Sequence, residues 1–487
     1  MDYKIPKCMS TQHPDNVNSP FFTQSSEIGG EDEIMEAYYS YSHLGCDEQM
    51  WDCEGKEIDN YVVKKLLTRY HNYFIENRLG RDIFLTLRVP NPTVEKPEAK
   101  ILIETLESIP RSFDASNLIF EDDIAPIFEV ILPMTTSSKC VDRVYCYYRD
   151  FVIGKSKKSF AEGDITIEDW IGKFYPNKIN VIPLIEDMEH MINADQILKN
   201  YLSDKNEKYH RVFFARSDPA MNYGLVSAVL INKIALQKIY HLSNTLNIEI
   251  YPIVGVGSAP FRGNLRPKNV QRVAKEYPYT YTFTIQSAFK YDNPPNDVMN
   301  GIKILRERKQ KSPINVDEHK SIEIIKRYSE EYEKQIMLLA PLINKVAKYI
   351  PSRRKRKLHI GLFGYSRNVG GINLPRAINF TASLYSLGIP PELLGLNALT
   401  EKYIDYIKQV YINFEEDLKD ALQFFNPNID YIPDVVKLKL KDLTIDYKQN
   451  QEHAEITSDI LDSLKKNKNE DLTENILMAA SIRKFLG

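Results

Sequence analysis

The hydrophobic residues of this chain fall in short, nearly continuous runs, and each run is followed at once by charged or turn-forming residues. One run, at residues 211–224 with the sequence RVFFARSDPAMNYG, passes from apolar residues into Arg216, Ser217 and Asp218. An amphipathic run over 224–246 follows and predicts a helix. The pattern therefore indicates a strand, a charged turn and a helix, in that order.

Similar apolar runs recur along the first three quarters of the chain, with short strands expected before His13 and near Trp51. Continuous apolar strands are typical of a sheet buried on both faces, which means parallel strands covered by helices. About eight or nine such strands predict an α/β fold, a TIM-type (β/α)8 barrel. The longer runs lie at 83–92, 127–137, 179–190, 211–215, 248–264, 279–292 and 358–371.

The remainder of the chain reads as helical. Helices are expected over 318–350, 374–385 and 401–425. We expect one domain over 1–487, with barrel strands mainly within 1–371 and additional inserted and C-terminal α-helices at 301–357 and 372–487.

Polar residues repeatedly follow the predicted strands, and the carboxyl ends of barrel strands form the active-site rim of this fold. Glu186 and Asp218 close successive strands, and two carboxylates with open water positions suit Mg²⁺, with Mn²⁺ as the alternative. A surface pair of Arg216 and Asp218 that caps the helix is the competing interpretation. Arginines and other polar side chains join them, and guanidinium groups bind phosphate or carboxylate at two points; these residues are Arg88, Arg216, Arg262, Gln286, Lys290 and Arg367.

Three further stretches allow two interpretations each. The glycine-rich loop at 255–263 either turns backbone N–H groups toward an oxyanion or only forms a tight turn. The acidic stretch that contains Asp47, Glu48, Asp52, Glu54 and Glu57 is either a cation site or a solvated turn, and the pattern favours the turn. The basic run SRRKRK at 352–357 is either a nucleic-acid patch or a solvated helix end, and its lack of aromatics favours the helix end.

Composition narrows the class of protein. The chain has 487 residues, is 43% hydrophobic and carries a formal net charge of −3, so no global field draws it to nucleic acid or a membrane. Its five cysteines form no CxxC pair, which is typical of reduced thiols. No apolar run is long enough to span a bilayer, and we expect a cytoplasmic protein.

Six motifs together resemble the archaeal-type phosphoenolpyruvate carboxylase family over essentially the whole chain: STQHPDN, QMWDCEGKE, LRVPNP, FFARSDPAMNYG, GVGSAPFRG and LPRAINFTASLYSLGIPPELLG. His13 is similar to the catalytic histidine in the TAHPTE motif of the larger bacterial and plant carboxylases. Glu186 and Asp218 match their metal carboxylates. The resemblance extends a catalytic role to Arg262 and Lys290, and a substrate-binding role to Arg88, Arg367, Arg376 and Gln286, and we also expect a catalytic role for Arg216.

The resemblance implies carboxylation of phosphoenolpyruvate with bicarbonate to give oxaloacetate and phosphate. It further implies Mg²⁺ dependence, a route through carboxyphosphate and an enolate, an anaplerotic role and a homotetramer. The loop at 255–263 is a candidate for excluding water from the enolate. Met221 stands where the larger enzymes have lysine, and Val254 and Val256 replace a histidine and an arginine, so we expect Arg216 to supply part of the missing charge.

Two other functions remain to be weighed. One is a barrel enzyme that handles pyruvate or phosphoenolpyruvate and makes or breaks C–C bonds without bicarbonate. The other is a catalytically silent scaffold for nucleic acid or protein, suggested only by the SRRKRK run.

Overall fold

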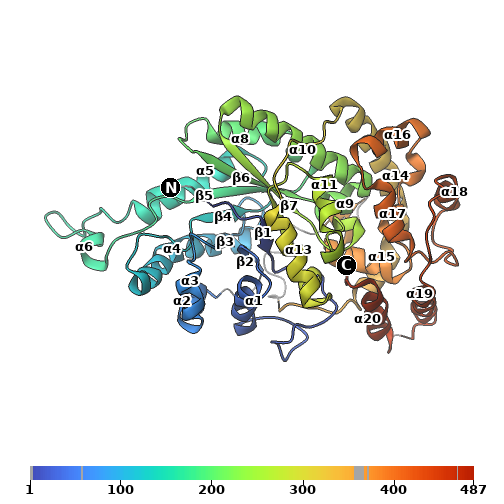
Figure 1. Ribbon diagram of the computed structural model, residues 1–487, viewed down its shortest axis with the longest axis horizontal. Helices are drawn as coiled ribbons and strands as arrows, with labels where there is room; N and C mark the ends of the chain where they lie inside the picture. Colours follow the sequence, from blue (N-terminus) through green and yellow to red (C-terminus); the bar gives the residue numbers. More distant parts are fainter. Residues whose placement is uncertain (1–3, 56–58, 356–366, 370–371, 469) are drawn as a thin grey trace.

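The computed structural model describes residues 4–55, 59–355, 367–369, 372–468 and 470–487. Eight parallel strands close into a barrel in the order of the sequence, which confirms the predicted (β/α)8 architecture (Figure 1). The strands are β1 Cys8–Ser10, β2 Glu48–Asp52, β3 Phe84–Arg88, β4 Glu129–Leu132, β5 Asn180–Ile185, β6 Tyr209–Ala215, β7 Glu249–Gly255 and β8 Thr282–Ile285.

Helices surround the barrel and then extend the chain beyond it. Those associated with the barrel are α1 Glu31–Ser42, α2 Val62–Arg69, α3 His71–Glu76, α4 Ala99–Phe120, α5 Ser138–Tyr147, α6 Ile167–Ile171, α7 Met188–Ile192, α8 Ala194–Leu202, α9 Ser217–Tyr223, α10 Leu225–Leu246, α11 Val270–Glu276, α12 Ser287–Tyr291 and α13 Pro295–Glu307. The later helices are α14 Glu318–Ala347, α15 Ala377–Ser386, α16 Glu401–Val410, α17 Phe414–Leu422, α18 Asp434–Asp442, α19 Gln451–Lys465 and α20 Leu472–Arg483.

The barrel interior has a charged layer and an apolar layer. In the charged layer, Arg211 of β6 binds Glu48 of β2 and Glu129 of β4, each at 2.7 Å, and all three side chains are buried. An unpaired charge would be costly at this depth, so the three residues stabilise the interior only as a set. The apolar layer consists of Met9, Met50, Ile131, Ile182, Leu184, Phe213, Ala215 and Ile253.

The burial of Glu48 corrects one expectation from the sequence. The acidic stretch around Trp51 is not a solvated turn, because Asp47, Asp52 and Glu54 are also buried. Glu57 lies outside the described residues. The stretch that the sequence suggests as a turn instead contains strand β2, which is part of the barrel wall.

The helix predicted after the charged turn is present as α10, and it is apolar around most of its surface because it lies between the barrel and α14. Gly224 separates α9 from α10 with a φ of 82°. A β-carbon there would lie 2.5 Å from Cε1 of Tyr328 in α14, so both the backbone conformation and the packing require glycine.

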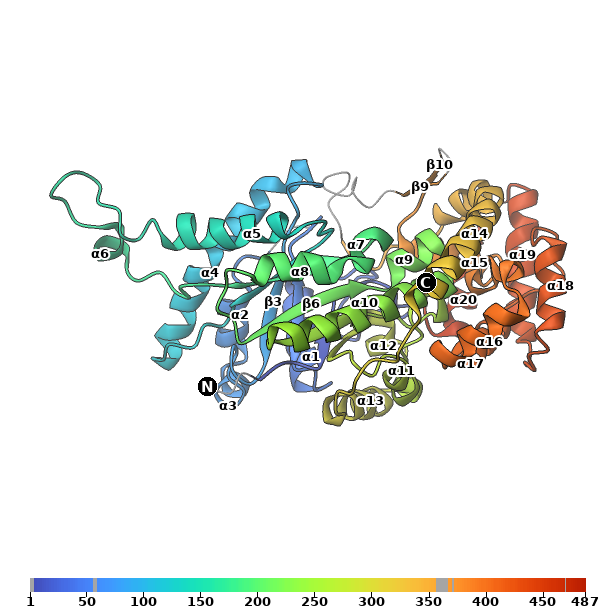
Figure 2. The same cartoon turned by 90° about the horizontal axis from the view of Figure 1, so that it is seen from above.

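The molecule is elongated in both ribbon views. The barrel occupies the middle, an arm that carries α6 projects from one side, and helices α14–α20 form a mass on the other (Figure 2). Helices α14–α20 confirm the predicted C-terminal helical addition, although the helix expected over 401–425 is divided into α16 and α17. All five cysteines are free thiols.

The last strand predicted from the sequence does not belong to the barrel. β9 Arg367–Val369 pairs antiparallel with β10 Ile372–Leu374 in a separate two-stranded sheet. The barrel is already closed at Ile285 by pairing between β8 and β1. The rest of the stretch predicted as this strand, residues 358–366, lies outside the described residues. Arg367 is therefore not placed at a barrel strand end, contrary to the prediction.

Candidate active site

A cavity of about 440 Å³ opens at the carboxyl ends of the barrel strands, where the sequence predicts the site. Its floor includes residues of the apolar layer, such as Met50, Leu184 and Phe213. Of the predicted site residues whose side chains the structure describes, all but Lys290 line it: His13, Arg88, Glu186, Arg216, Asp218, Arg262, Gln286 and Arg376.

Glu186 and Asp218 follow adjacent strands, because β5 pairs with β6 up to Ile185 and Phe214. Glu186 is buried and accepts a hydrogen bond of 2.9 Å from the backbone N–H of Met134 through Oε2. Among the described residues, no group of three or more His, Cys, Asp or Glu side chains is arranged to hold a metal ion. Two hard carboxylates facing one cavity fit a divalent ion whose other ligands are water or substrate oxygens.

His13 is half-buried in the cavity wall, three residues after β1. Its Nδ1 lies 3.0 Å from the hydroxyl of Thr11, and its backbone carbonyl accepts hydrogen bonds from the N–H groups of Asp15 and Ser287. The turn that carries the imidazole is thus tied to the start of α12.

Arg262 has a full set of acceptors. Nε donates to Ser217 Oγ at 3.1 Å, Nη2 donates to Gln286 Oε1 at 2.7 Å, and Nη1 donates to the backbone oxygen of Gly487 at 2.6 Å and approaches Asp15 at 3.4 Å. Burial lowers the pKa of Arg262, and the charges of Asp15 and Asp218 partly offset this effect. Residues distant in sequence therefore hold this guanidinium rigidly near the carboxylates of Asp15 and Asp218.

Arg88, at the end of β3, is paired with acids. Its Nη1 lies 3.0 Å from Asp52 Oδ1 and 2.5 Å from Glu54 Oε2, and all three residues are buried. Burial raises the pKa of nearby Glu95 to about 10, and the hydrogen bond with Glu54 adds to the shift. The charge of Arg88 is thus largely offset by its own neighbours.

Arg216 does not present its charge in the way that the sequence suggests. Its Nε donates to Tyr277 Oη and its Nη1 donates to the Phe261 carbonyl, each at 3.2 Å, and the side chain is buried. It is not the surface helix cap of the competing interpretation either. It contributes to the cavity wall while its guanidinium is bound by Tyr277, the residue after α11, and by Phe261 of the glycine-rich loop.

The glycine-rich loop is a fixed wall. Gly257 N–H donates to the Arg262 carbonyl at 2.8 Å, and Val256 N–H donates to Thr284 Oγ1 at 2.8 Å. Gly263 N–H donates to the Pro260 carbonyl at 3.2 Å. Because these donors are used within the barrel and the segment is buried, the loop does not cradle an oxyanion with them. A tight turn is the interpretation that holds.

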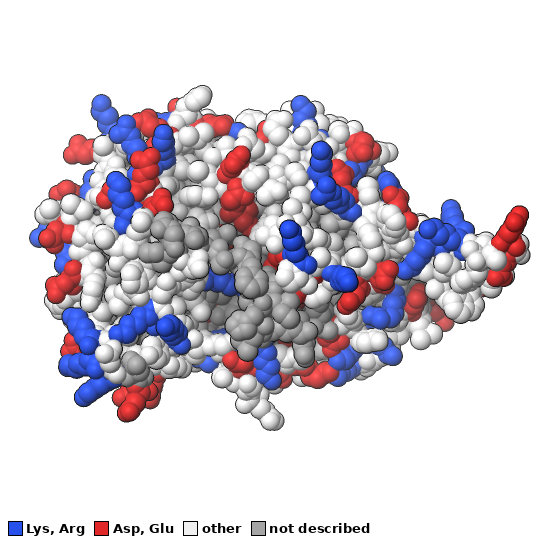
Figure 3. All heavy atoms as spheres, turned by 180° about the vertical axis from the view of Figure 1, so that it is seen from behind, with Lys and Arg blue, Asp and Glu red and all other residues white. Residues whose placement is uncertain are grey.

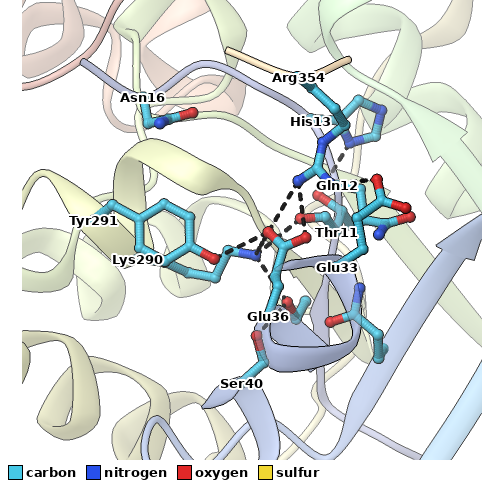
Figure 4. A network of polar contacts seen from close by, with 12 residues as sticks. Thr11, Gln12, His13, Asn16, Glu33, Glu36, Ser40, Lys290, Tyr291 and Arg354 are labelled. Atoms are coloured by element: carbon cyan, nitrogen blue, oxygen red, sulfur yellow. Dashed lines mark hydrogen bonds and ion pairs between the residues drawn. The ribbon is translucent and has the colours of Figure 1, made fainter. Parts of the chain in front are cut away.

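Lys290 lies behind the site rather than in it. It is buried in α12, donates to the Thr11 carbonyl at 3.0 Å and to Ser10 Oγ at 3.1 Å, and forms an ion pair with Glu36 at 3.0 Å (Figure 4). Lys290 thus supports the turn that leads to His13, and the prediction of direct catalysis is not met by its position.

Sequence reasoning missed two residues of the basic run. Arg353 and Arg354 are 7% and 1% exposed and both line the cavity. They are therefore neither a nucleic-acid patch nor a solvated helix end. The signal was the charge run itself, but nothing local shows that the segment after α14 returns to the barrel mouth. The face in Figure 3 likewise carries interspersed acidic and basic side chains rather than one basic field.

Comparison with known proteins agrees with this geometry. A family model described as phosphoenolpyruvate carboxylase matches residues 5–487. The chain belongs to the phosphoenolpyruvate carboxylase family. It is 56% identical to the phosphoenolpyruvate carboxylase of Methanothermobacter thermautotrophicus and 57% identical to that of Methanospirillum hungatei, with 99% of this chain and 100% of each relative covered. The phosphoenolpyruvate carboxylase of Pyrococcus furiosus is 57% identical over 87% of this chain and 89% of its own length.

Membership of the phosphoenolpyruvate carboxylase family confirms the resemblance inferred from the six motifs and identifies the chain as an enzyme, a lyase. Within the part of the chain that the structure describes, no helix has both the length and the apolar character needed to cross a membrane.

Proposed function

We propose that this enzyme carboxylates phosphoenolpyruvate with bicarbonate to give oxaloacetate and phosphate. The observation that carries the proposal is the meeting of Glu186 and Asp218, from adjacent strands, with His13 and several arginines around one cavity. Family membership supplies the substrate class, and the cavity supplies groups that suit two anions.

The reaction must bring together two anions that repel each other in water. Arg262, which is held by its protein partners, would offset this repulsion through its fixed charge, and Arg376 would help to hold the anions for attack of a bicarbonate oxygen on phosphorus, which gives carboxyphosphate and the enolate of pyruvate. His13 would then accept the proton of carboxyphosphate, so that CO₂ and phosphate separate within the cavity. The carbon nucleophile of the enolate attacks CO₂ and forms oxaloacetate. The apolar floor at Met50, Leu184 and Phe213 limits the water that would protonate the enolate to pyruvate.

Glu186 and Asp218 are the residues that would hold the divalent ion, for which we propose Mg²⁺, with Mn²⁺ as an alternative. The ion, when bound, would stabilise negative charge that develops on the phosphate and enolate oxygens. The buried Glu186, fixed by the Met134 N–H, provides a ligand that needs little reorganisation.

The test is a coupled oxaloacetate assay in which phosphoenolpyruvate, bicarbonate and Mg²⁺ are omitted in turn. We expect turnover to require all three. Phosphate release that is independent of bicarbonate would reject the proposal and favour a barrel enzyme of pyruvate chemistry. We also propose an anaplerotic role, a cytoplasmic location and a homotetramer, for which size measurements in solution are the test of assembly.

A further inference from the structure

Most of the arginines at the cavity are already committed to protein partners. Arg88 is held by Asp52 and Glu54, and Arg262 by four acceptors. Arg216 is bound to Tyr277 and Phe261, and Arg354 to two glutamates of α1. A buried cation that is satisfied by the protein gains little from a ligand, because the ligand must compete with existing contacts.

Arg353 differs from these arginines. Its side chain is 7% exposed and lines the cavity, yet no ion pair or hydrogen bond joins its guanidinium to any described residue. Its buried Nε has no hydrogen-bond partner in the described part of the chain. Burial lowers the pKa of Arg353, and the charge of Asp292 partly offsets this effect. The oxygens of Asp292 are already occupied by the N–H groups of Val17 and Asn18 at 2.7 and 2.8 Å.

The backbone explains why neighbouring arginines have different roles. Residues 353–355 run beside Ile28, with Ile28 N–H bonded to the Arg353 carbonyl at 3.0 Å and Lys355 N–H bonded to the Ile28 carbonyl at 2.9 Å. Arg354 then anchors the segment through Glu33 and Glu36, at 2.8 Å each (Figure 4). With the backbone fixed on both sides, Arg353 is held at the cavity without an acceptor among the residues that the structure describes.

We propose that Arg353 is an anion-binding residue of the active cavity, where its guanidinium receives an oxyanion group, phosphate or carboxylate, of a reactant. The planar fork of arginine offers two parallel N–H donors to either group. A charge that the protein desolvates, and for which the described residues offer no acceptor, is stabilised when an anion enters. This inference rests on the proposed function for the identity of the reactant, but not for the binding itself.

Binding can be measured without turnover. The wild-type protein, Arg353→Met and Lys355→Met are titrated with inorganic phosphate, and separately with pyruvate, in buffer free of divalent ions, and the Kd is obtained from the rise in Tm with ligand concentration. Lys355→Met is the matched control, because it removes one charge from the same segment at an exposed position. We expect Arg353→Met to weaken binding of one or both ligands about 10- to 100-fold, while the control binds as the wild type does.

The pattern of loss identifies the group that Arg353 binds. Weaker phosphate binding alone indicates a phosphate contact, and weaker pyruvate binding indicates a carboxylate contact. Unchanged binding of both ligands, or an equal loss in Lys355→Met, would overturn the proposal. Because the assay excludes catalysis, a wild-type protein that binds anions but makes no oxaloacetate would count against the proposed function and not against this inference.

A second measurement covers the case in which Arg353→Met does not fold. The wild-type protein is treated with phenylglyoxal, with and without saturating phosphate or pyruvate, and modification of the peptide that contains Arg353 is followed by mass spectrometry. We expect at least one ligand to protect Arg353. Equal modification with and without both ligands would overturn the proposal.

Discussion

Lys290 and Arg354 bind the same carboxylate oxygen, since each donates a hydrogen bond of 3.0 Å to Oε1 of Glu36. The contact joins α12, the segment after α14 and α1, three parts of the chain that are far apart in the sequence (Figure 4). Lys290 also holds the Thr11 carbonyl, two residues before His13. A buried set of charges thus lies directly beneath the turn that carries the imidazole.

Replacement of Glu36 by Gln should destabilise the protein strongly. The variant leaves Lys290 and Arg354 buried without their shared counter-charge, and loss of one partner of a buried pair costs about 3–5 kcal/mol of unfolding free energy. Denaturant unfolding measures this loss. The control is Glu31→Gln on the same helix, whose exposed pairs with Lys65 and Arg69 should contribute about 1 kcal/mol or less. Equal losses in the two variants would contradict the assignment.

Glu36 also predicts a pH dependence of stability. Burial alone would raise its pKa, but the charges of Arg354 and Lys290 outweigh burial and lower the pKa from 4.5 to about 2. A carboxyl group with a lowered folded-state pKa stabilises the protein above pH 4.5, and this contribution disappears as the pH falls from 4.5 toward 2. Glu36→Gln cannot titrate, so it should lose less stability than the wild type across that window. Parallel curves for the two proteins would exclude this role.

Replacement of Asp218 by Asn should weaken metal dependence. Removing one of two carboxylates should raise the Mg²⁺ concentration for half-maximal activity and lower kcat roughly 100-fold or more, because several kcal/mol of charge stabilisation are lost. A Mg²⁺ titration of activity measures both effects. Asp187→Asn is the control, since this carboxylate follows the neighbouring strand but caps α7 through His190 N–H. Near-normal turnover of Asp218→Asn would remove the residue from the metal site.

Replacement of His13 by Asn should separate binding from carboxylation. The backbone contacts that hold the turn are unchanged, so phosphoenolpyruvate should still bind with near wild-type affinity. Loss of the group that moves the proton should lower oxaloacetate formation about 10²- to 10⁴-fold. Substrate protection against thermal unfolding and the oxaloacetate assay give the two readouts. If carboxylation is unchanged, His13 has a structural role alone.

Replacement of Arg262 by Ala should alter the fate of the enolate. The change leaves Ser217, Gln286 and Asp15 without their common donor and opens space beside the carboxylates. Water should then reach the enolate more often, and the ratio of pyruvate to oxaloacetate should rise. Product analysis after complete turnover measures this ratio. Arg262→Lys keeps the charge and most of the volume, so its ratio of pyruvate to oxaloacetate should lie between those of the wild type and Arg262→Ala. A wild-type ratio in Arg262→Ala would place the residue outside the reaction.

Local sequence patterns are sufficient to predict the barrel and the polar residues that gather at its rim. A continuous apolar run such as that in β6 indicates a strand buried on both faces, here between the barrel interior and the surrounding helices, and the polar residue that follows each run then lies at the strand end. Local pattern therefore places Glu186 and Asp218 at one rim. The same reasoning predicts a further barrel strand near Arg367, and this prediction is wrong. β9 pairs with β10 outside the barrel, and no local sequence pattern distinguishes such a strand from a barrel strand.

The role of each charged side chain depends on long-range contacts that local patterns do not show. The sequence predicts both Lys290 and Arg88 near strand ends, yet Lys290 supports a turn from within α12 and Arg88 is held between Asp52 and Glu54. The basic run reads as a surface feature because charge is normally solvated, but α14 returns it to the barrel mouth, where Arg354 meets Glu36 and Arg353 faces the cavity. The groups that neutralise a charged side chain and set its direction can lie hundreds of residues away in the sequence. Local sequence patterns therefore cannot predict these contacts.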